Sequence, residues 1–354
     1  MRSRAWVEID LGALQQNAET MARRAGVPLI PMVKSDAYGL GAVEVSRRLE
    51  RLDPWAFGVA TTAEGIELRR AGIERRILVF TPLLADEFAA ARAANLTPTL
   101  GEPAAIAAWI ESGGGAWHLA IDTGMNRAGL MWQRVCEVTD LVRARPPEGA
   151  FTHFHSAEQG DGSMSEQERR FTEALAALPD RPRWLHADNS AALEQRSPSP
   201  WDLARPGLFL YGGASAHNAA VRPMSVARLR APIVEIRDVA AGESVSYGAT
   251  YRASATRRVA TIAAGYGDGV RRSLGNRGHA LVGGRRVPIV GVVTMDMTMI
   301  DVTGAPCAVG DPVTLLGRDG DEVLEVNEVA RAAEASPYEL LVHLRLRASR
   351  VYVG

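Results

Sequence analysis

Short apolar runs alternate with longer amphipathic stretches along the first 215 residues of the chain. Runs of about four to eight apolar residues are typical of buried strands, and apolar residues spaced three and four apart are typical of helices. Eight runs predict strands: Leu29–Val33, Ala56–Ala60, Ile77–Phe80, Thr97–Leu100, Trp117–Ile121, Ala150–Phe154, Arg183–His186 and Gly207–Tyr211. The segments between them predict helices: Ala42–Leu52, Thr62–Arg70, Asp86–Asn95, Pro103–Glu111, Gln133–Arg143 and Ser165–Leu178.

This alternation predicts an α/β fold, a (β/α)8 TIM barrel whose active site lies at the carboxyl ends of the strands. An open, doubly wound parallel sheet is the alternative, because periodicity alone does not show whether a sheet closes.

The pattern changes after Tyr211. Residues 225–317 predict strands with no helices between them: Pro232–Ile236, Arg258–Ala264, Ala280–Val282, Val287–Val293, Met299–Val302 and Pro312–Leu316. We therefore expect a C-terminal domain built mainly or entirely from strands, with a boundary near Gly212–Pro223. The two expected domains are residues 1–215, the barrel, and residues 216–354, the β domain, with which the first few residues could also pack.

The composition is that of an ordinary soluble protein. Of 354 residues 47% are hydrophobic, and 40 Lys and Arg residues nearly balance 41 Asp and Glu residues, which disfavours disorder and a nucleic-acid partner. With only Cys136 and Cys307 the chain lacks the cysteines for a disulfide framework or a four-thiolate zinc site, so we expect no metal and a reducing cytoplasm. Glu8 and Asp10 interrupt any signal-peptide core, and no apolar run approaches the roughly 18–20 residues of a membrane span, so we expect no membrane partner.

Lys34 is the first candidate for chemistry. It follows the first predicted strand, and a turn with Tyr38 and Gly39 comes after it, which places the amine at the active-site rim of a barrel. A desolvated lysine amine is a nucleophile suited to Schiff-base chemistry. The alternative is a surface cation with a buried aliphatic stem.

Other polar side chains stand near predicted strand ends. Arg127 suits a carboxylate through paired donors. His153 lies within an apolar strand pattern, as a core histidine would, and His155 would share its face in a continuing strand, so we expect only one of the two to be functional. The segments around Ser190 and Arg205 offer a hydroxyl and backbone amides near the last two strands, where barrels bind phosphate.

Seven motifs resemble, in their order along the chain, those of bacterial alanine racemases, and the resemblance covers residues 6 to 351. They are Lys34-Ser-Asp-Ala-Tyr38-Gly39, Asp122-Thr-Gly-Met-Asn-Arg127, Thr152-His153-Phe154, His186-Ala-Asp-Asn189-Ser190, Arg205-Pro206-Gly207, Ser246-Tyr247-Gly-Ala-Thr-Tyr251 and Met295-Asp296. The lysine motif combined with the tyrosine motif is highly specific. The resemblance implies an isomerase with a barrel, a β domain and the cofactor pyridoxal 5′-phosphate (PLP).

The resemblance also implies catalytic roles. Lys34 would hold PLP and act as one base, and Tyr247 would act as the other base on the opposite face of the substrate Cα. Arg205 would face the pyridine nitrogen and keep it unprotonated, because a guanidinium has no acceptor lone pair. His153 would lie against the ring and link to Tyr247.

The implied binding positions fall into three groups. They are Tyr38, Ser190, Gly207 and Leu208 for the phosphate, Arg127 and the Met295 amide for the substrate carboxylate, and Tyr266 for the access side. In the family, the positions of Tyr247, Tyr266 and Met295 reach the site from the partner subunit. The resemblance therefore implies a head-to-tail homodimer with two shared active sites.

Three positions depart from the family pattern. Ala120 replaces a frequent, often carbamylated lysine, so Arg127 loses an anionic neighbour that a chloride or a water could replace. Val292 stands where the family often has an arginine, and Leu346 stands where some relatives have a tyrosine that contacts phosphate. These departures bear on affinity and not on the reaction.

The resemblance predicts interconversion of L- and D-alanine, which would supply D-alanine for the peptidoglycan of the cell wall. One alternative is a serine or broad-specificity racemase of the same fold, because packing discriminates one extra group by only about 1–3 kcal/mol. A non-catalytic PLP-binding protein is another alternative, and a decarboxylase of similar plan is disfavoured by the setting of Tyr247.

Overall fold

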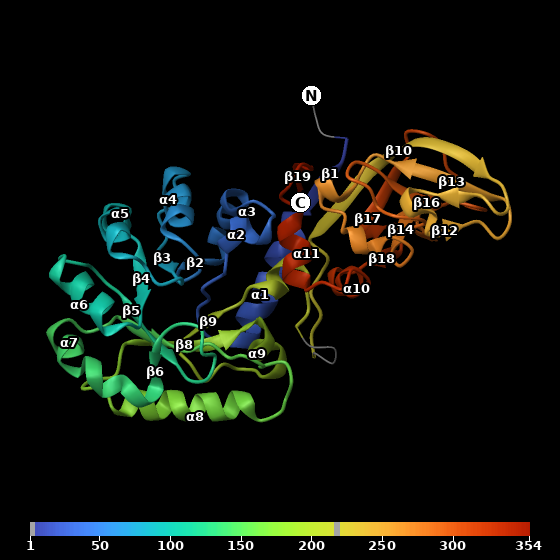
Figure 1. Cartoon of the computed structure of the whole chain (residues 1–354). Helices are drawn as coiled ribbons and strands as arrows, with labels where there is room; N and C mark the ends of the chain where they lie inside the picture. Colours follow the sequence, from blue (N-terminus) through green and yellow to red (C-terminus); the bar gives the residue numbers. More distant parts are fainter. Residues whose placement is uncertain (1–3, 216–219) are drawn as a thin grey trace.

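The computed structural model describes residues 4–215 and 220–354, and its amino-terminal part is a barrel of parallel strands (Figure 1). Neighbouring strands are β2 (Phe57–Val59), β3 (Ile77–Val79), β4 (Thr97–Leu100), β5 (His118–Asp122), β7 (Gly149–Phe151), β8 (Trp184–Asn189) and β9 (Leu203–Arg205). Residues 29–33 close the ring, because the Ile30 N–H donates to the Ala204 carbonyl at 2.7 Å and the Val33 N–H donates to the Gly58 carbonyl at 2.8 Å. The predicted TIM barrel is confirmed, and the open-sheet alternative is wrong.

Helices surround these strands, as Figure 1 shows for α4 to α8. They are α1 (Leu11–Ala25), α2 (Lys34–Tyr38), α3 (Ala42–Leu49), α4 (Thr62–Arg70), α5 (Phe88–Ala93), α6 (Pro103–Glu111), α7 (Thr139–Ala144), α8 (Ser163–Ala176) and α9 (Ser190–Gln195). Helix α1 begins where the Asp10 carboxylate accepts the Ala13 N–H, and it ends at Gly26, whose φ of 65° favours glycine. A two-residue strand, β6 (Leu130–Met131), pairs with β5.

The predicted last strand, Gly207–Tyr211, is wrong. Leu208–Tyr211 form a 3₁₀ helix, and the strand is β9, which ends two residues before Gly207. Pro206 has no N–H to continue the strand ladder. The Leu-Phe-Leu-Tyr run is fully buried and contacts α1, and an apolar run alone does not distinguish a strand from a buried helix.

Several other strands are shorter than predicted, and the predicted strand Leu29–Val33 makes only isolated bridges, at Leu29 and Met32. Strand β7 ends at Phe151, because the Thr152 hydroxyl pairs with the Thr123 hydroxyl at 2.6 Å and the Thr152 carbonyl accepts from Arg205. The predicted strand Val287–Val293 is reduced to the end of β15 (Arg285–Pro288) and an isolated bridge at Ile289.

The second domain is a nine-stranded sheet around the long strand β10 (Ala227–Val239). Its other strands are β1 (Trp6–Asp10), β13 (Arg257–Ile262), β14 (His279–Val282), β15, β16 (Thr298–Asp301), β17 (Pro312–Asp319), β18 (Glu322–Leu324) and β19 (Ser349–Val353). A separate hairpin pairs β11 (Ser244–Val245) with β12 (Tyr251–Arg252). The domain also contains α10 (Val326–Ala332) and α11 (Pro337–His343), so it is mainly but not entirely β.

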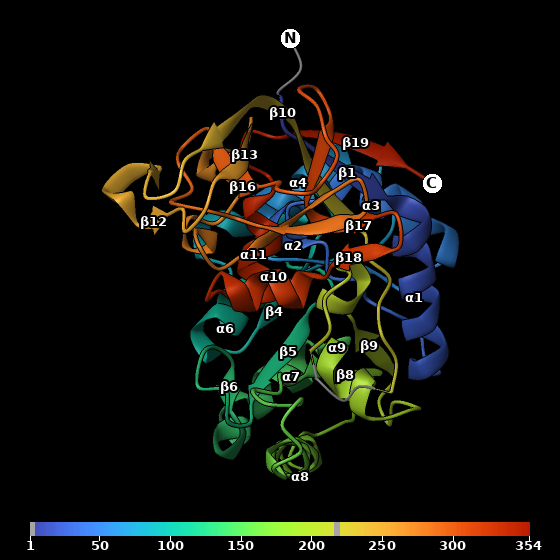
Figure 2. The ribbon, with the colours of Figure 1, turned by 90° about the vertical axis from the view of Figure 1, so that its right-hand side faces the viewer.

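The two ends of the chain join this sheet and bring it against the barrel. Strand β1 pairs with β10 antiparallel and with β19 parallel, and α11 contacts α2 (Figures 1 and 2). The boundary between residues 215 and 216 stays a prediction, and residues 216–219 of the predicted linker lie outside the described residues. In the described ranges no helix has both the length and the apolar character needed to cross a membrane.

Candidate active site

Lys34 lies at the carboxyl end of the barrel strands, where residues 29–33 end and α2 begins. Its side chain is half-buried. Burial lowers the pKa of Lys34, the positive charges of Arg127 and Arg205 lower it further, and the carboxylate of Glu64 opposes them. The amine is therefore easier to deprotonate than an exposed lysine, which is the condition for a nucleophile or base.

The turn after Lys34 has an uncommon backbone. Ser35, Asp36, Ala37 and Tyr38 have φ values of 54°, 57°, 51° and 54°, so four successive residues with side chains are left-handed. Each costs roughly 1–2 kcal/mol, and such strain clusters at functional sites. The turn carries Tyr38 inward, where its ring stacks on Tyr211 with centroids 4.6 Å apart.

The residues predicted to bind phosphate lie together next to this turn: Tyr38, Ser190, Gly207 and Leu208. A Cβ added at Gly207 would lie 2.3 Å from the Tyr38 hydroxyl oxygen, so only glycine permits this approach. The Ser190 hydroxyl accepts the N–H groups of Gly207 at 2.9 Å and Phe209 at 3.3 Å. Burial raises the pKa of Tyr38, which keeps its hydroxyl a neutral donor.

Arg205 is buried in the barrel, 3% exposed. Its Nη1 donates to Nδ1 and to the carbonyl of His186, both at 2.7 Å, and its Nη2 donates to the carbonyls of Thr152 at 2.8 Å and Ala187 at 3.0 Å. Its Nε–H has no acceptor among the described residues. Burial lowers the pKa of Arg205 to about 9, so the guanidinium stays charged at neutral pH.

This arginine fixes two histidine tautomers. Because arginine only donates, Nδ1 of His186 accepts and its Nε2 carries the hydrogen, which donates to Nδ1 of His118 at 2.8 Å. Burial lowers the pKa of His118 to about 3, so its ring is neutral at neutral pH. The hydrogen bonds from Arg205 to His186 and from His186 to His118 therefore persist at neutral pH.

His153 belongs to the same region as Lys34. Burial lowers the pKa of His153 to about 3, and Arg205, Arg127 and Lys34 lower it as well, which requires these charges to lie close to the ring. His155 is exposed, since the strand that would have aligned the two rings ends before them.

Arg127 is exposed, and its backbone N–H donates to the Asp122 carboxylate at 3.2 Å. No ion-pair partner for its guanidinium occurs among residues 4–215 and 220–354. Ala120 on β5, the residue that departs from the family pattern, is partly buried.

Tyr247, Tyr266 and Met295 lie on the β domain and are 74%, 39% and 55% exposed. The Tyr266 N–H donates to the carbonyl of Thr294, which places Tyr266 beside Met295. Hairpin strand β12, near Tyr247 in the sequence, lies at an outer edge of the β domain, away from α2, which begins at Lys34 (Figure 2). Among the described residues, no hydrogen bond, ion pair or ring contact joins any of the three side chains to Lys34.

The other two departures from the family pattern also lie in the second domain. Val292 accepts a hydrogen bond from the Ser246 hydroxyl through its carbonyl at 2.7 Å, next to Tyr247. Leu346 is 53% exposed.

One signal in the sequence strengthens the choice of Lys34. Lys34 is the only lysine of the chain, and the other 39 of its 40 basic residues are arginine. Arginine can replace lysine as a solvated cation but not as a deprotonated amine, so the single lysine points to amine chemistry. Glu64, whose charge acts on Lys34, is a residue that the sequence analysis missed. No feature of the sequence marks it, because a glutamate in the first turn of a helix is common.

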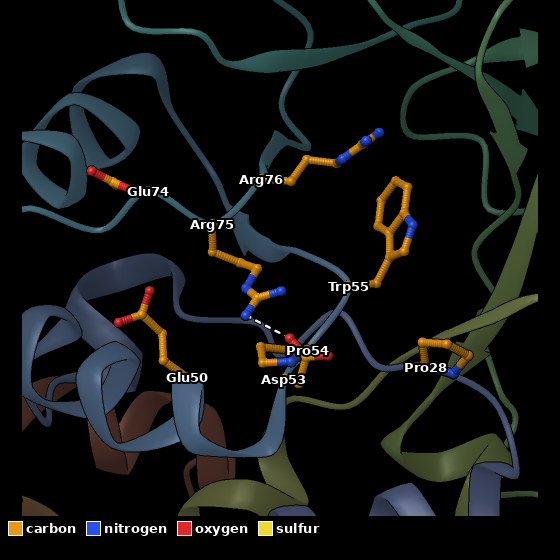
Figure 3. A pocket seen from close by; sticks show the side chains of 8 residues that line it. All are labelled: Pro28, Glu50, Asp53, Pro54, Trp55, Glu74, Arg75 and Arg76. Carbon is orange, nitrogen blue, oxygen red and sulfur yellow. Dashed lines mark ion pairs between the residues drawn. The ribbon is translucent and has the colours of Figure 1, made fainter.

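A cavity of about 690 Å³ lies at the opposite end of the barrel (Figure 3). It is lined by residues that precede the strands, among them Pro28, Trp55 and Arg76, and the ion pair between Arg75 and Asp53 crosses it at 2.6 Å. It contains none of the predicted site residues, and the amino-terminal face of such barrels contributes to stability.

Known proteins share this architecture over its full length. A family model described as alanine racemase, N-terminal domain, matches residues 9–215, and one described as alanine racemase, C-terminal domain, matches residues 226–352. An alanine racemase of Geobacter sulfurreducens is 37% identical over 370 residues, 98% of this chain and 96% of that protein. Alanine racemase from E. faecalis has a similar structure, with a TM-score of 0.93, 31% identity and coverage of 99% of this chain and 98% of that one. The crystal structure of alanine racemase from Bartonella henselae with covalently bound pyridoxal phosphate is also similar. Its TM-score is 0.91, its sequence identity is 26%, and the match covers 99% of each chain. This chain belongs to the alanine racemase family.

Proposed function

We propose that this protein interconverts L- and D-alanine, with PLP held by Lys34 at the carboxyl end of the barrel. Membership of the alanine racemase family supports the reaction, and the relative with covalently bound pyridoxal phosphate supports the cofactor. The observation that carries the assignment is Lys34 itself: the single lysine of the chain, half-buried at a strand end beside Arg127 and Arg205.

The residues around Lys34 fit PLP. The Ser190 hydroxyl accepts two backbone N–H groups, so its own hydrogen is left to donate to a phosphate oxygen. The Tyr38 hydroxyl lies against Gly207, where the missing Cβ keeps the backbone open to a close polar ligand. We assign phosphate binding to these residues together with the backbone at Leu208.

Arg205 would bind the pyridine nitrogen. Its terminal nitrogens are committed to four acceptors, and Nε–H is the remaining donor. A guanidinium that holds its proton leaves the ring nitrogen unprotonated, which favours return of the proton to Cα over side reactions. His153, kept neutral by its surroundings, would lie beside the ring.

PLP, when bound, withdraws electrons from the substrate Cα and so acidifies its proton. In one direction the neutral amine of Lys34 would remove this proton on one face and the phenol of Tyr247 would donate its own proton on the other. In the reverse direction the phenolate of Tyr247 would remove the proton and the ammonium of Lys34 would donate one. A single base would return the proton largely to the face it left, whereas two opposed bases invert Cα. Arg127 and the Met295 amide would bind the substrate carboxylate, with Tyr266 on the access side.

A head-to-tail homodimer would complete the site. The three residues assigned from the β domain are exposed within one chain, and the residues assigned from the barrel lie in the other domain. A second copy would cover these aromatic and methionine side chains and bring them to the barrel. We assign the enzyme to the cytoplasm and to the supply of D-alanine for the cell wall on the family resemblance.

The comparisons favour neither alternative, a serine or broad-specificity racemase or a non-catalytic PLP-binding protein. The test is incubation of the PLP-loaded protein with L-alanine in deuterated water, followed by chiral separation and mass spectrometry. We expect D-alanine with deuterium at Cα, and much slower conversion of L-serine. Absence of both D-alanine and Cα deuterium would refute the proposal. Equal rates on L-alanine and L-serine would refute the assignment of alanine as the preferred substrate.

A further inference from the structure

The left-handed turn after Lys34 is held at its first residue by one carboxylate. The Ser35 N–H donates to Glu64 Oε1 at 2.7 Å. The second oxygen of the same carboxylate, Oε2, accepts the N–H of Ala60 at 2.7 Å. Ser35 follows Lys34, directly after the segment of residues 29–33, and Ala60 follows β2. Glu64 therefore joins two neighbouring strand ends at the active-site edge.

The geometry is specific to a carboxylate of this length. Two N–H donors point at two separate oxygens, and a glutamine would offer only one acceptor and set its own NH₂ against the other donor. Glu64 is the third residue of α4, where its N–H is within 3.3 Å of the Thr61 hydroxyl, so the helix start fixes the side chain. Four strained residues persist only when their surroundings over-determine them, and this bridge is one such restraint.

The carboxylate is also a charge near the amine. Among the groups that perturb Lys34, Arg127 and Arg205 are positive and Glu64 is the negative one. Its charge partly offsets the burial and the two arginines, which together lower the pKa of Lys34.

We propose that Glu64 is a positioning residue for Lys34: its carboxylate bridges Ser35 and Ala60, fixes the strained turn and keeps a negative charge beside the turn that carries the amine. The proposal rests on the proposed function only in taking Lys34 as the reacting amine. The competing view is that Glu64 merely caps a helix, in which case its loss would lower stability and leave the amine unchanged.

The single lysine gives a direct measurement. The full-length chain, freed of cofactor, is labelled with limiting acetic anhydride across a pH series, and the Lys34 peptide is quantified by mass spectrometry. We expect E64Q to react several-fold faster than the parent below the midpoint, because loss of the negative charge favours the neutral amine. The loaded E64Q enzyme should lose up to about 100-fold in turnover, because a misplaced reacting group is costly.

Two further variants decide between positioning and capping. Glu87→Gln is the matched control, since Glu87 Oε2 accepts the Leu84 N–H at 2.9 Å in the next βα unit, and it should match the parent in labelling and turnover. Glu64→Asp keeps the charge but is too short to bridge both donors, so its labelling should resemble the parent while its turnover falls about 10-fold.

An unchanged labelling midpoint in E64Q, or full turnover in Glu64→Asp, would overturn the proposal. If E64Q does not fold, Glu64→Asp alone still tests the bridge. The labelling is independent of racemisation, so a parent enzyme that racemises alanine while E64Q labels normally would refute the role of Glu64 and leave the proposed function standing.

Discussion

The barrel end around Lys34 and the exposed tip of the β domain around Tyr247 are built differently. Near Lys34, Arg205 is buried and has four acceptors within 3.0 Å, and burial lowers the pKa of His153 to about 3, so that its ring is neutral. Around Tyr247 the side chains face outward, with Tyr247 itself 74% exposed. The barrel half is pre-organised within one chain, whereas the side chains of the β-domain half are exposed, and the proposed dimer would cover them.

The contrast identifies where each kind of change should act. Substitutions in the barrel half alter groups whose environment already exists in one chain, so their effects appear in labelling and stability. Substitutions at the β-domain tip should alter turnover with little effect on the folding of one chain, since exposed side chains contribute little to stability.

The largest effect is expected from Lys34→Arg. It preserves a positive charge but removes the amine, and it leaves a chain without lysine. We expect loss of covalent PLP attachment and at least about 10⁴-fold lower turnover, as for other essential catalytic groups. Absorbance of the bound cofactor and chiral assay measure both, and retained turnover would contradict the assignment.

Tyr247→Phe should lower turnover by about 10²–10⁴-fold, the range for a lost acid–base group. The visible absorbance of bound PLP should remain, because the barrel half is unchanged. Loss of the cofactor together with activity would instead give Tyr247 a binding role. Tyr251→Phe, the second tyrosine of the same motif, is the control.

Mixing the two inactive variants tests whether the halves meet between chains. In a head-to-tail dimer, one site of each mixed dimer combines the intact Lys34 of one copy with the intact Tyr247 of the other. After subunit exchange an equal mixture should regain about a quarter of the parent turnover. No recovery, despite exchange demonstrated by a mass-tagged copy, would place both bases within one chain.

The neutral buried histidines predict loss of stability in acid. Their pKa values are lowered to about 3 by burial for His118 and His153, against about 6.5 when unfolded. Stability is therefore complete above about pH 6.5 and falls as the pH drops toward 3, by up to about 1.4 kcal/mol per pH unit for each histidine.

His118→Asn isolates one of these contributions. The asparagine oxygen can replace Nδ1 as the acceptor for His186. The free energy of unfolding, measured in urea between pH 8 and 4, should therefore fall less steeply with decreasing pH, by the contribution of one histidine. Equal slopes in the parent and in His118→Asn would show that His118 is not neutral when folded.

The smallest effect concerns the strained turn. Ser35→Gly removes the cost of the left-handed backbone at φ 54° but raises the conformational entropy of the unfolded chain. We expect the free energy of unfolding to rise by about 0–1 kcal/mol. Ala89→Gly on the exposed face of α5 should instead lose about 1 kcal/mol. Thermal unfolding compares them, and a loss at Ser35 as large as at Ala89 would mean that the turn carries no strain.

Local patterns predicted most of the barrel but not its last strand or the strand ends. The run Leu208–Tyr211 has the composition of a buried strand, and its helical form follows from Pro206 and from contact with α1, which local sequence does not encode. The amino-terminal strand β1 was not predicted at all, because its partners β10 and β19 are far away in sequence.

The sequence by itself determined the chemistry of the site. The lysine motif after an apolar run and the later tyrosine motif pointed to the family and to Lys34 as the proposed reacting amine, since residue type decides what chemistry is open. The tertiary structure decided the environment of that amine: the left-handed turn, the Glu64 bridge and the chain from Arg205 through His186 to His118. These depend on burial and on contacts between residues distant in sequence, and burial is a property of the packed fold and not of any segment alone.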